Sequence, residues 1–152
     1  QVKEICVQLL RNAVTHGIEA PEDRELTEKP IEGRIDLRLA KLSDEEMEIT
    51  VMDDGNGLDY SAIREKAIES GRWAEDEIDS WGNKHLLALI FHEGFSTAKE
   101  VSKDAGRGVG MEAVMNHVLQ HRGKITVSSR RGRHCRFVIT LPIIPAREGI
   151  AA

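Results

Sequence analysis

Apolar residues recur every three or four positions between residues 2 and 16, which is the period of an amphipathic helix. Gly17 stands where such a helix would end. Residues 17–32 then hold two prolines and eight charged side chains without a clean period. We therefore expect a surface loop there, with room for one short helical turn.

Two following stretches alternate apolar and polar residues with the period of β-strands. Residues 33–42 have an apolar side chain at every second position from Ile35, and residues 47–54 do the same from Met47. The polar residues 43–46 between them supply a turn. Together the two stretches predict a hairpin.

The rest of the chain switches between helical and strand patterns. Residues 93–106 show no sustained period and have glycines at their edges, so they are a candidate mobile loop. The other expected elements are helices at 59–70, 84–92 and 109–121, and two strands within 123–142 that are joined around Gly132 and end at Pro142.

This order of helix, hairpin, helices and hairpin predicts an α+β fold, a two-layer α/β sandwich with helices on one face of a mixed, mostly antiparallel sheet. A chain of 152 residues is long enough for one hydrophobic core and short for two. We therefore expect a single domain over residues 1–145, followed by a tail or linker at 146–152.

The composition of the chain bears on its expected localisation and on the roles of its cysteines. No run approaches the roughly 20 apolar residues of a membrane span, and the N-terminal residues lack a signal-peptide pattern. Cys6 and Cys135 are too few for a disulfide framework and, with six scattered histidines, form no evident zinc-ligand pattern, so we expect buried thiols. The expected localisation is cytoplasmic, without membrane insertion and without nucleic acid as a partner.

The formal net charge of -5 hides an asymmetry along the chain. Residues 1–95 carry 11 Lys or Arg and 22 Asp or Glu, whereas residues 96–152 carry 10 and 4. A basic C-terminal part is compatible with phosphate binding and equally with a solvated basic hairpin. Charge alone does not choose between them.

Three polar residues, Gln8, Asn12 and His16, follow one another at i, i+4 spacing in the first expected helix, so their side chains point from one face. A solvated helix surface is the simpler explanation if that helix is taken alone. The amide oxygen of Asn12 is also a hard ligand that suits Mg²⁺ on the phosphates of a nucleotide, where the ion keeps several of its waters.

An acidic, glycine-bearing turn follows the second expected strand, with the sequence Asp53-Asp54-Gly55-Asn56-Gly57. A common hairpin or loop device explains it with equal weight. In the functional interpretation, a carboxylate at the strand end accepts a hydrogen bond from the exocyclic amine of adenine. The glycines then let a flat ring lie against the backbone.

Three glycines, Gly106, Gly108 and Gly110, lie at the start of the helix expected at 109–121. Free backbone N–H groups at a helix N-terminus bind phosphate. The spacing G-x-G-x-G after a long loop differs from the G-x-G-x-x-G that follows the first strand of a dinucleotide-binding unit, and no G-x-x-x-x-G-K-[ST] occurs. These differences exclude a nicotinamide-dependent enzyme of the Rossmann type and a P-loop protein.

Four segments in this order resemble the motifs of one family. LLRNAVTHGIEAPEDR, VMDDGNGLD, LIFHEGFSTAKEV and AGRGVGMEAV are similar to the asparagine box, first glycine box, phenylalanine box and second glycine box of the Bergerat-fold (GHKL) ATPases. HGIE-x-PE-x-R, GFST and GRGVGM resemble the ATP-binding catalytic domain of CheA-like, chemotaxis-type histidine kinases, over about residues 4–142. The resemblance implies ATP and Mg²⁺ as cofactors and a lid over the phosphates at about residues 95–106.

The resemblance also implies a role for each matching position. Asn12 would be the magnesium-chelating asparagine, Asp53 the adenine-binding aspartate, and His16 a residue of the phosphate region. For Phe91 and Phe95, core packing remains as good an explanation as nucleotide contact. The other implied nucleotide-binding residues are Gly55 and Gly57, then Ser96, Thr97 and Lys99 of the lid with Lys103 and Arg107 as weaker candidates, and finally Gly106, Gly108, Val109, Gly110 and Met111.

Four positions depart from the pattern of the family. Gln8 stands where CheA-like kinases have His and many relatives have Glu, and Thr15 stands where chemotaxis kinases usually have Asp. His134 and Cys135 replace a glycine and a threonine that helps to hold adenine, which points to altered adenine affinity or selectivity. An amide at position 8 cannot take a proton from water near neutral pH, so poor ATP hydrolysis is expected.

The function implied by the resemblance is that of the catalytic domain of a two-component histidine protein kinase. It would transfer the γ-phosphoryl group of ATP to a histidine on a separate phosphotransfer domain, with Gln8, Asn12 and His16 as catalytic residues. Its partners would be that phosphotransfer domain, in the parent chain or in trans, a response regulator, and receptor or adaptor proteins. The alternative is a degenerate module for nucleotide sensing or docking; a serine kinase or topoisomerase-type ATPase is a third class, which HGIE and GFST disfavour.

Overall fold

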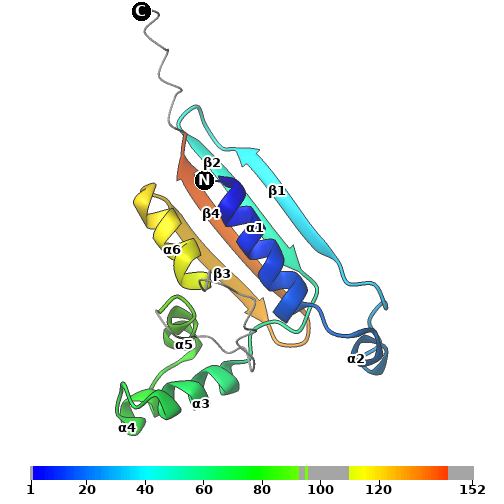
Figure 1. The fold of residues 1–152 in the computed structure, drawn as a ribbon, viewed down its shortest axis with the longest axis vertical. Helices are drawn as coiled ribbons and strands as arrows, with labels where there is room; N and C mark the ends of the chain where they lie inside the picture. The colour runs from blue at the N-terminus through cyan, green and yellow to red at the C-terminus, as the bar shows by residue number, and fades with distance from the viewer. Residues whose placement is uncertain (1, 93–94, 96–109, 144–152) are drawn as a thin grey trace, which may run out of the picture.

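The computed structural model of the chain describes residues 2–92, 95 and 110–143. Figure 1 shows a twisted sheet with helices over one face, and a group of short helices beyond one end of the sheet. In chain order the elements are α1 (Val2–Asn12), the π-helical turn η1 (Ala13–Gly17), α2 (Pro21–Leu26), β1 (Ile35–Lys41), β2 (Glu46–Asp53), α3 (Tyr60–Ser70), α4 (Glu75–Asp79), α5 (Asn83–Leu89), α6 (Met111–Gln120), β3 (Lys124–Arg130) and β4 (His134–Pro142).

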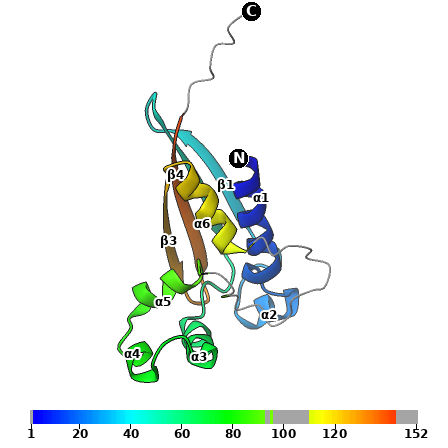
Figure 2. The same ribbon diagram turned by 60° about the vertical axis from the view of Figure 1, so that its left-hand side comes forward.

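The sheet has the strand order β1-β2-β4-β3, and every described neighbour is antiparallel. The two hairpins pair locally, and β2 joins β4 at the centre, so that Asp53 lies opposite Cys135. Figure 2 shows α1 and α6 beside each other on the same face. The predicted α+β sandwich with helices on one face is therefore confirmed. The sheet was expected to be mixed and mostly antiparallel, and all the described strand pairs are antiparallel.

The main core lies between the sheet and the two covering helices. The strands contribute every second side chain to it, and the helices contribute side chains at spacings of three and four residues, as the hydrophobic pattern predicts. Fully burying one such Ile, Leu or Val stabilises the fold by about 1.5–3 kcal/mol. The most completely buried members are Ile5 and Leu9 of α1, Val114 and Val118 of α6, and Ile49, Val51 and Ile139 of the sheet.

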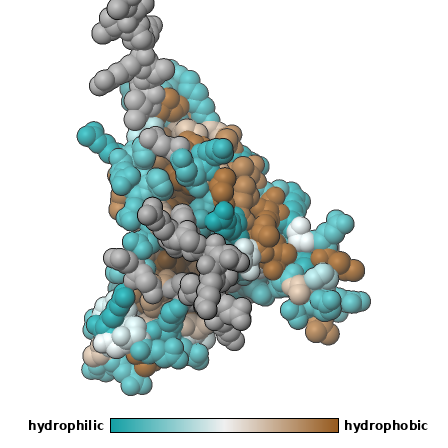
Figure 3. Space-filling model, in the orientation of Figure 1, coloured by the Kyte–Doolittle hydropathy of each residue, from teal (hydrophilic) through white to brown (hydrophobic). Residues whose placement is uncertain are grey.

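The edge strand β1 departs from this pattern. Leu37 and Leu39 pair with buried residues of β2 and so point to the helix-covered face, yet they are 45% and 54% exposed. The reason is position, because β1 is the edge strand and the core cluster is built over its neighbours. Val7 of α1 and Val14 of η1 are also exposed. Figure 3 shows apolar surface gathered over α1 and β1.

Helices α3, α4 and α5 enclose a second, smaller core whose buried members include Ile63, Leu86 and Phe95. The expected helix at 59–70 forms as α3: the Asp59 side chain accepts a hydrogen bond from the Ala62 N–H, and Gly71 ends the helix at φ 64°. Two short helices refine the expectation. The turn expected within 17–32 is the six-residue α2, and α4 occupies a stretch for which the pattern predicted no element.

Two further helices match their expected positions to within a few residues. The helix expected at 84–92 forms as α5, and the one expected at 109–121 forms as α6. The candidate loop at 93–106 lies outside the described residues except for Phe95. In the described part of the chain, no helix has both the length and the apolar character needed to cross a membrane.

Candidate nucleotide-binding site

Residues from three distant parts of the chain meet at one end of the sheet. They are the turn η1, the glycine-bearing turn that follows β2, and the tip of the β3–β4 hairpin. We call residues 53–57 the acidic turn. Its place between η1 and the hairpin is set by the antiparallel pairing of β2 with β4, because that pairing brings the end of β2 beside the start of β4.

Asp53 is the last residue of β2, and its side chain is directed into the protein. It is 4% exposed, and its Oδ1 accepts a hydrogen bond from the backbone N–H of Gly55 at 3.0 Å. Burial raises the pKa of Asp53 above its usual value; the Gly55 N–H acts in the opposite direction, and the nearby charges of Asp54 and Glu19 raise the pKa further. A buried carboxylate with acceptor capacity left is suited to the exocyclic amine of a base.

Gly55 and Gly57 are explained by contacts within the protein. A Cβ atom at Gly55 would lie 2.0 Å from the carbonyl oxygen of Gly17, which no side chain can tolerate. At Gly57 φ is 65°, and a Cβ atom would lie 2.6 Å from the carbonyl oxygen of Arg130. The glycines therefore let the acidic turn pack against η1 on one side and against β3 on the other, whether or not a ring also lies on them.

Backbone hydrogen bonds hold the acidic turn from both sides. The Asn56 N–H donates to the Gly17 carbonyl at 2.8 Å, and the Gly132 N–H donates to the Asn56 carbonyl at 2.6 Å. Just beyond the turn, the Leu58 N–H donates to Ser129 Oγ at 2.7 Å. Sequence reasoning did not identify Gly17 or Ser129 as parts of the site, because their partners are far away in the sequence.

The π-helical turn η1 explains how Gly17 reaches the acidic turn. The helix predicted over residues 2–16 is α-helical to Asn12 and then widens, with the Ile18 N–H donating to the Ala13 carbonyl at 2.8 Å. Single π turns inside helices occur frequently at functional sites. A Cβ atom at Gly17 would lie 3.1 Å from Asp53 Oδ1, so this position also keeps the space around the carboxylate free.

The second half of the site is a chain of neutral groups on α1 and α6. Gln8 is 5% exposed, and its Nε2 donates to Asn12 Oδ1 at 3.1 Å. The Asn12 Nδ2 in turn donates to the sulfur of Met111 at 2.9 Å. The predicted i, i+4 neighbours Gln8 and Asn12 are thus in contact, while His16 and Thr15 on η1 are exposed.

Met111 is the first residue of α6, and Gly110 is its N-cap in an extended conformation. The contact with Asn12 therefore joins residues of the asparagine box and the second glycine box, 99 positions apart. The remaining predicted phosphate-binding residues lie outside the described residues: Ser96, Thr97, Lys99, Lys103, Gly106, Arg107, Gly108 and Val109.

The two phenylalanines of the third motif lie in different surroundings. Phe95 is 7% exposed and packs in the core of α3 to α5, with Lys66 Nζ 5.8 Å from its ring centre. Phe91 is half-buried and helps to line a groove of about 560 Å³ with residues of α5 and α6, among them Met115. Both therefore have a structural role in this fold.

Cys135 and His134 lie beside Asp53. Burial and the Asp53 carboxylate raise the pKa of the Cys135 thiol to about 12, so the thiol is neutral near pH 7. A positive charge on half-buried His134 would lower the pKa of Asp53. The expectation that both cysteines are buried free thiols is confirmed.

The whole chain has the features of one ATPase family. Residues 1–145 match the family described as histidine kinase-, DNA gyrase B-, and HSP90-like ATPase, and the chain belongs to that family. Membership implies that it binds ATP. The buried Asp53 carboxylate can accept a hydrogen bond from an adenine amine, and the amide oxygen of Asn12 is a hard ligand of the kind that a magnesium ion takes.

Relatives place the chain within the family. It is 41% identical to the "Chemotaxis protein CheA" of Halobacterium salinarum over 96% of its own length, and 40% identical to the protein of the same name from Bacillus subtilis over 94%. A "Gliding motility regulatory protein" from Myxococcus xanthus is 38% identical over 93% of the chain. Over nearly its whole length, the chain is thus similar to one part of these chemotaxis proteins.

These relatives are much longer proteins. The chain spans 22% of the Halobacterium protein and 21% of the Bacillus protein. Among solved structures, it resembles the catalytic domain of histidine kinase ThkA, with a TM-score of 0.53, 16% identity and coverage of 93% of this chain and 64% of that one. It also resembles the mycobacterial sensor histidine kinase MprB, with a TM-score of 0.52, 19% identity and coverage of 91% of this chain and 68% of that one. These two likenesses support the fold.

Proposed function

We propose that this domain binds Mg²⁺–ATP and transfers the γ-phosphoryl group to a histidine on a separate phosphotransfer domain. The observation that carries the proposal is the contact between Asn12 and Met111, which joins residues of two of the predicted nucleotide motifs. The CheA-type relatives favour histidine as the acceptor.

The base-binding part of the site would be the acidic turn. Asp53 would accept the hydrogen bond of the exocyclic amine, and Gly55 and Gly57 would let the turn pack against η1 and β3, which holds it in place for the base. Because the turn is already held by Gly17 and Gly132, little conformational entropy would be lost on binding.

The metal-binding part of the site would rely on few protein ligands. In the described part of the chain, no group of three or more His, Cys, Asp and Glu side chains could hold a metal ion. Asn12 would therefore be the protein ligand, with phosphate and water oxygens completing the shell, as Mg²⁺ commonly prefers. Bound Mg²⁺ would supply neutralisation of the phosphate charge. Gln8 would fix the orientation of the Asn12 amide, and His16 would contribute at the phosphate end.

Gln8 favours transfer to histidine over hydrolysis. An amide cannot accept a proton from attacking water near neutral pH, so hydrolysis lacks its base. A neutral imidazole attacks with a nitrogen lone pair: the N–P bond forms, the bond between the γ-phosphorus and the bridging oxygen breaks, ADP leaves, and the imidazole N–H proton passes to solvent. Positioning and charge neutralisation dominate such a step.

The partners of the reaction follow from this assignment. The acceptor histidine would lie on a phosphotransfer domain, in the parent chain or on another protein, and a response regulator would take the phosphoryl group from it. Receptor or adaptor proteins would regulate the rate of this phosphotransfer. Residues 1–145 would act as one domain, residues 95–106 as the lid, and 146–152 as a tail or linker.

The test combines the purified protein, Mg²⁺, ATP labelled at the γ-phosphate, and the phosphotransfer domain encoded with it. We expect acid-labile, base-stable label on that domain, and none with Asn12→Ala. A wild-type protein that binds Mg²⁺–ATP in a calorimeter but never labels the domain would contradict the proposed transfer. Absence of both binding and labelling would favour the docking module.

A further inference from the structure

Arg24 is a charged side chain with no exposed surface. It lies on α2, as the last residue of the HGIE-x-PE-x-R segment, where the resemblance implied no role for it, and it is 0% exposed. Arginine is almost never fully buried unless it is paired, because removing its charge from water is costly. Its partners therefore indicate what the buried charge holds in place.

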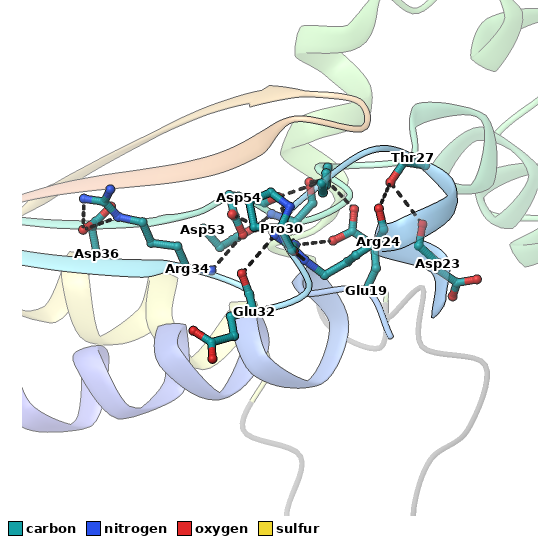
Figure 4. A network of polar contacts seen from close by, with 12 residues as sticks. Glu19, Asp23, Arg24, Thr27, Pro30, Glu32, Arg34, Asp36, Asp53 and Asp54 are labelled. Carbon is teal, nitrogen blue, oxygen red and sulfur yellow. Dashed lines mark hydrogen bonds and ion pairs between the residues drawn. The ribbon is translucent and has the colours of Figure 1, made fainter. Parts of the chain in front are cut away.

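The guanidinium of Arg24 joins the acidic turn to the segment that follows η1. Its Nη1 donates to Glu19 Oε2 at 2.9 Å, and its Nη2 donates to Asp54 Oδ2, also at 2.9 Å. The Nε donates to the Pro30 carbonyl at 2.6 Å, and Nη2 lies 3.4 Å from the Glu32 carbonyl oxygen. Figure 4 shows Glu19, Pro30, Glu32 and Asp54 grouped around Arg24, with dashed lines for the contacts.

Lys29 extends the same network to the backbone of the acidic turn. Its Nζ donates to the carbonyl oxygens of Asp54 and Gly55, each at 3.0 Å, and it is ion-paired with Glu19. Two cations and two carboxylates therefore balance in one cluster. Arg34 adds a backbone N–H that donates to Asp54 Oδ1 at 2.9 Å.

We propose that Arg24 is a positioning residue of the nucleotide pocket, which fixes the acidic turn so that Asp53 presents its carboxylate to the base. The proposal deepens the proposed function and rests on it for the identity of the ligand. Arg24 binds the side chain of Asp54 directly. It also binds Glu19, which in turn orients Lys29, and the Lys29 ammonium donates to the backbone carbonyls of Asp54 and Gly55.

The electrostatics of the two adjacent aspartates agree with this role. Burial acts to raise the pKa of Asp54, but the hydrogen bonds from Arg24 and from the Arg34 N–H bring it below its usual value. Asp53, by contrast, has its pKa raised by burial and by the charges of Asp54 and Glu19, with His134 acting against them. Arg24 neutralises the two carboxylates that disfavour an ionised Asp53.

The test uses Arg24→Gln, which keeps hydrogen-bond donors and removes the charge, with Arg34→Gln as the matched control. The Arg34 side chain is 75% exposed and pairs with exposed Asp36, so its loss should leave the pocket unchanged. The milder Asp54→Asn removes the charge that Arg24 holds, and it serves if Arg24→Gln fails to fold. Circular dichroism checks that each variant is folded.

Two measurements follow on the folded proteins. Hydrogen exchange of the Gly55 and Asn56 amides without nucleotide reports the order of the turn itself, and we expect it to become at least about tenfold faster, as for a loss of local protection. Titration with ADP should show affinity about tenfold lower. In Arg24→Gln the acid limb of the pH profile should also move to higher pH, whereas in Asp54→Asn it should not, because a charge that raises the pKa of Asp53 is removed. Arg34→Gln should change none of these.

The outcomes separate this proposal from the proposed function. Unchanged exchange of the two amides in a folded Arg24→Gln or Asp54→Asn protein overturns the positioning role, whatever the nucleotide does. Faster exchange with unaltered ADP affinity and pH profile overturns it as well. Failure of the wild-type protein to bind ADP or ATP, with the exchange effect present, counts against the proposed function and leaves Arg24 as the residue that orders the turn.

Discussion

The proposed base end and the proposed metal end of the site are built in different ways. At the base end, Asp53 and the acidic turn are held by buried charges and by backbone hydrogen bonds from η1 and the β3–β4 hairpin. At the metal end, Gln8, Asn12 and Met111 form a short chain of neutral groups. The base end is therefore held by a branched network of ion pairs and hydrogen bonds, whereas the metal end is held by two successive side-chain hydrogen bonds.

This difference indicates how the two ends contribute to binding. The turn at the base end is ordered before any ligand arrives, so its residues should set the affinity for every adenine nucleotide. Asn12 has an oxygen that suits Mg²⁺, and among the described residues its side chain hydrogen-bonds Gln8 and Met111. Its effect should therefore appear when both phosphates and Mg²⁺ are present. Variants at the two ends should therefore separate by ligand.

The largest effect is expected at the base end, for Asp53→Ala. Loss of a buried charged acceptor costs about 1.5–3 kcal/mol, which is roughly 10- to 150-fold in affinity. Calorimetric titration should show the same loss for ATP, ADP and adenosine, because all three carry the base. Asp36→Ala on the exposed edge strand is the control. A loss confined to ATP would contradict the division into two ends.

A smaller and more selective effect is expected at the metal end, for Asn12→Ala. The affinity for ATP with Mg²⁺ should fall about tenfold, whereas the affinity for adenosine should stay within about twofold. Asn116→Ala on the exposed side of α6 serves as the control. Equal losses for all ligands, with or without Mg²⁺, would show that Asn12 supports the pocket as a whole.

From the sequence one can propose residues for each end, but not the contacts that connect them. Asp53 and Asn12 lie in short motifs whose chemistry can be inferred locally, and the alternation of apolar residues predicts both hairpins. Ser129 and Gly17 could not be found in that way, because their roles depend on residues that approach only after β2 has paired with β4.

The same limit applies to burial. Leu37 and Leu39 have the pattern of a half-buried strand, yet they remain exposed because β1 forms the edge of the sheet. Conversely, Arg24 lies in a highly charged stretch that reads as a surface loop, and its side chain is fully buried. In both cases the number of neighbouring elements decides the exposure, and that number is a property of the tertiary fold.

The two adjacent aspartates should respond to acid in opposite ways. Asp53 has a raised pKa, so it takes up a proton in the folded protein at a pH above the usual value for aspartate, and nucleotide affinity should fall as pH drops through that range. Asp54 has a lowered pKa, so its contribution to stability is complete above the usual value and is lost only as the pH falls further.

A pH window should therefore exist in which affinity declines while the fold persists. We expect about a fivefold loss, since one charge-assisted hydrogen bond becomes an ordinary one. Titration calorimetry gives the affinity, and circular dichroism follows the fold over the same range. In Asp53→Asn this part of the pH dependence should disappear, which separates it from protonation of the nucleotide. A profile that is identical in both proteins would place the titrating group elsewhere.

The smallest effect is expected for Cys135→Thr. This variant tests how far the base end extends, and it leaves the residues of the metal end unchanged. Cys135 lies opposite Asp53, and its thiol is neutral because its pKa is about 12. Sulfur is a weak hydrogen-bond partner, whereas a threonine hydroxyl both donates and accepts well, and a β-branched residue suits this strand.

An added hydrogen bond at the low end of the usual range, about 0.5–1 kcal/mol, should strengthen the binding of ATP, ADP and adenosine about threefold. Cys6→Ala, which alters the other buried thiol in the main core, should leave all three affinities unchanged. An increase that requires Mg²⁺ would mean that position 135 acts through the phosphates, and the base end would then include less of β4 than its register opposite Asp53 indicates. An increase shared by all three ligands would extend the base end from the acidic turn onto the first residues of β4.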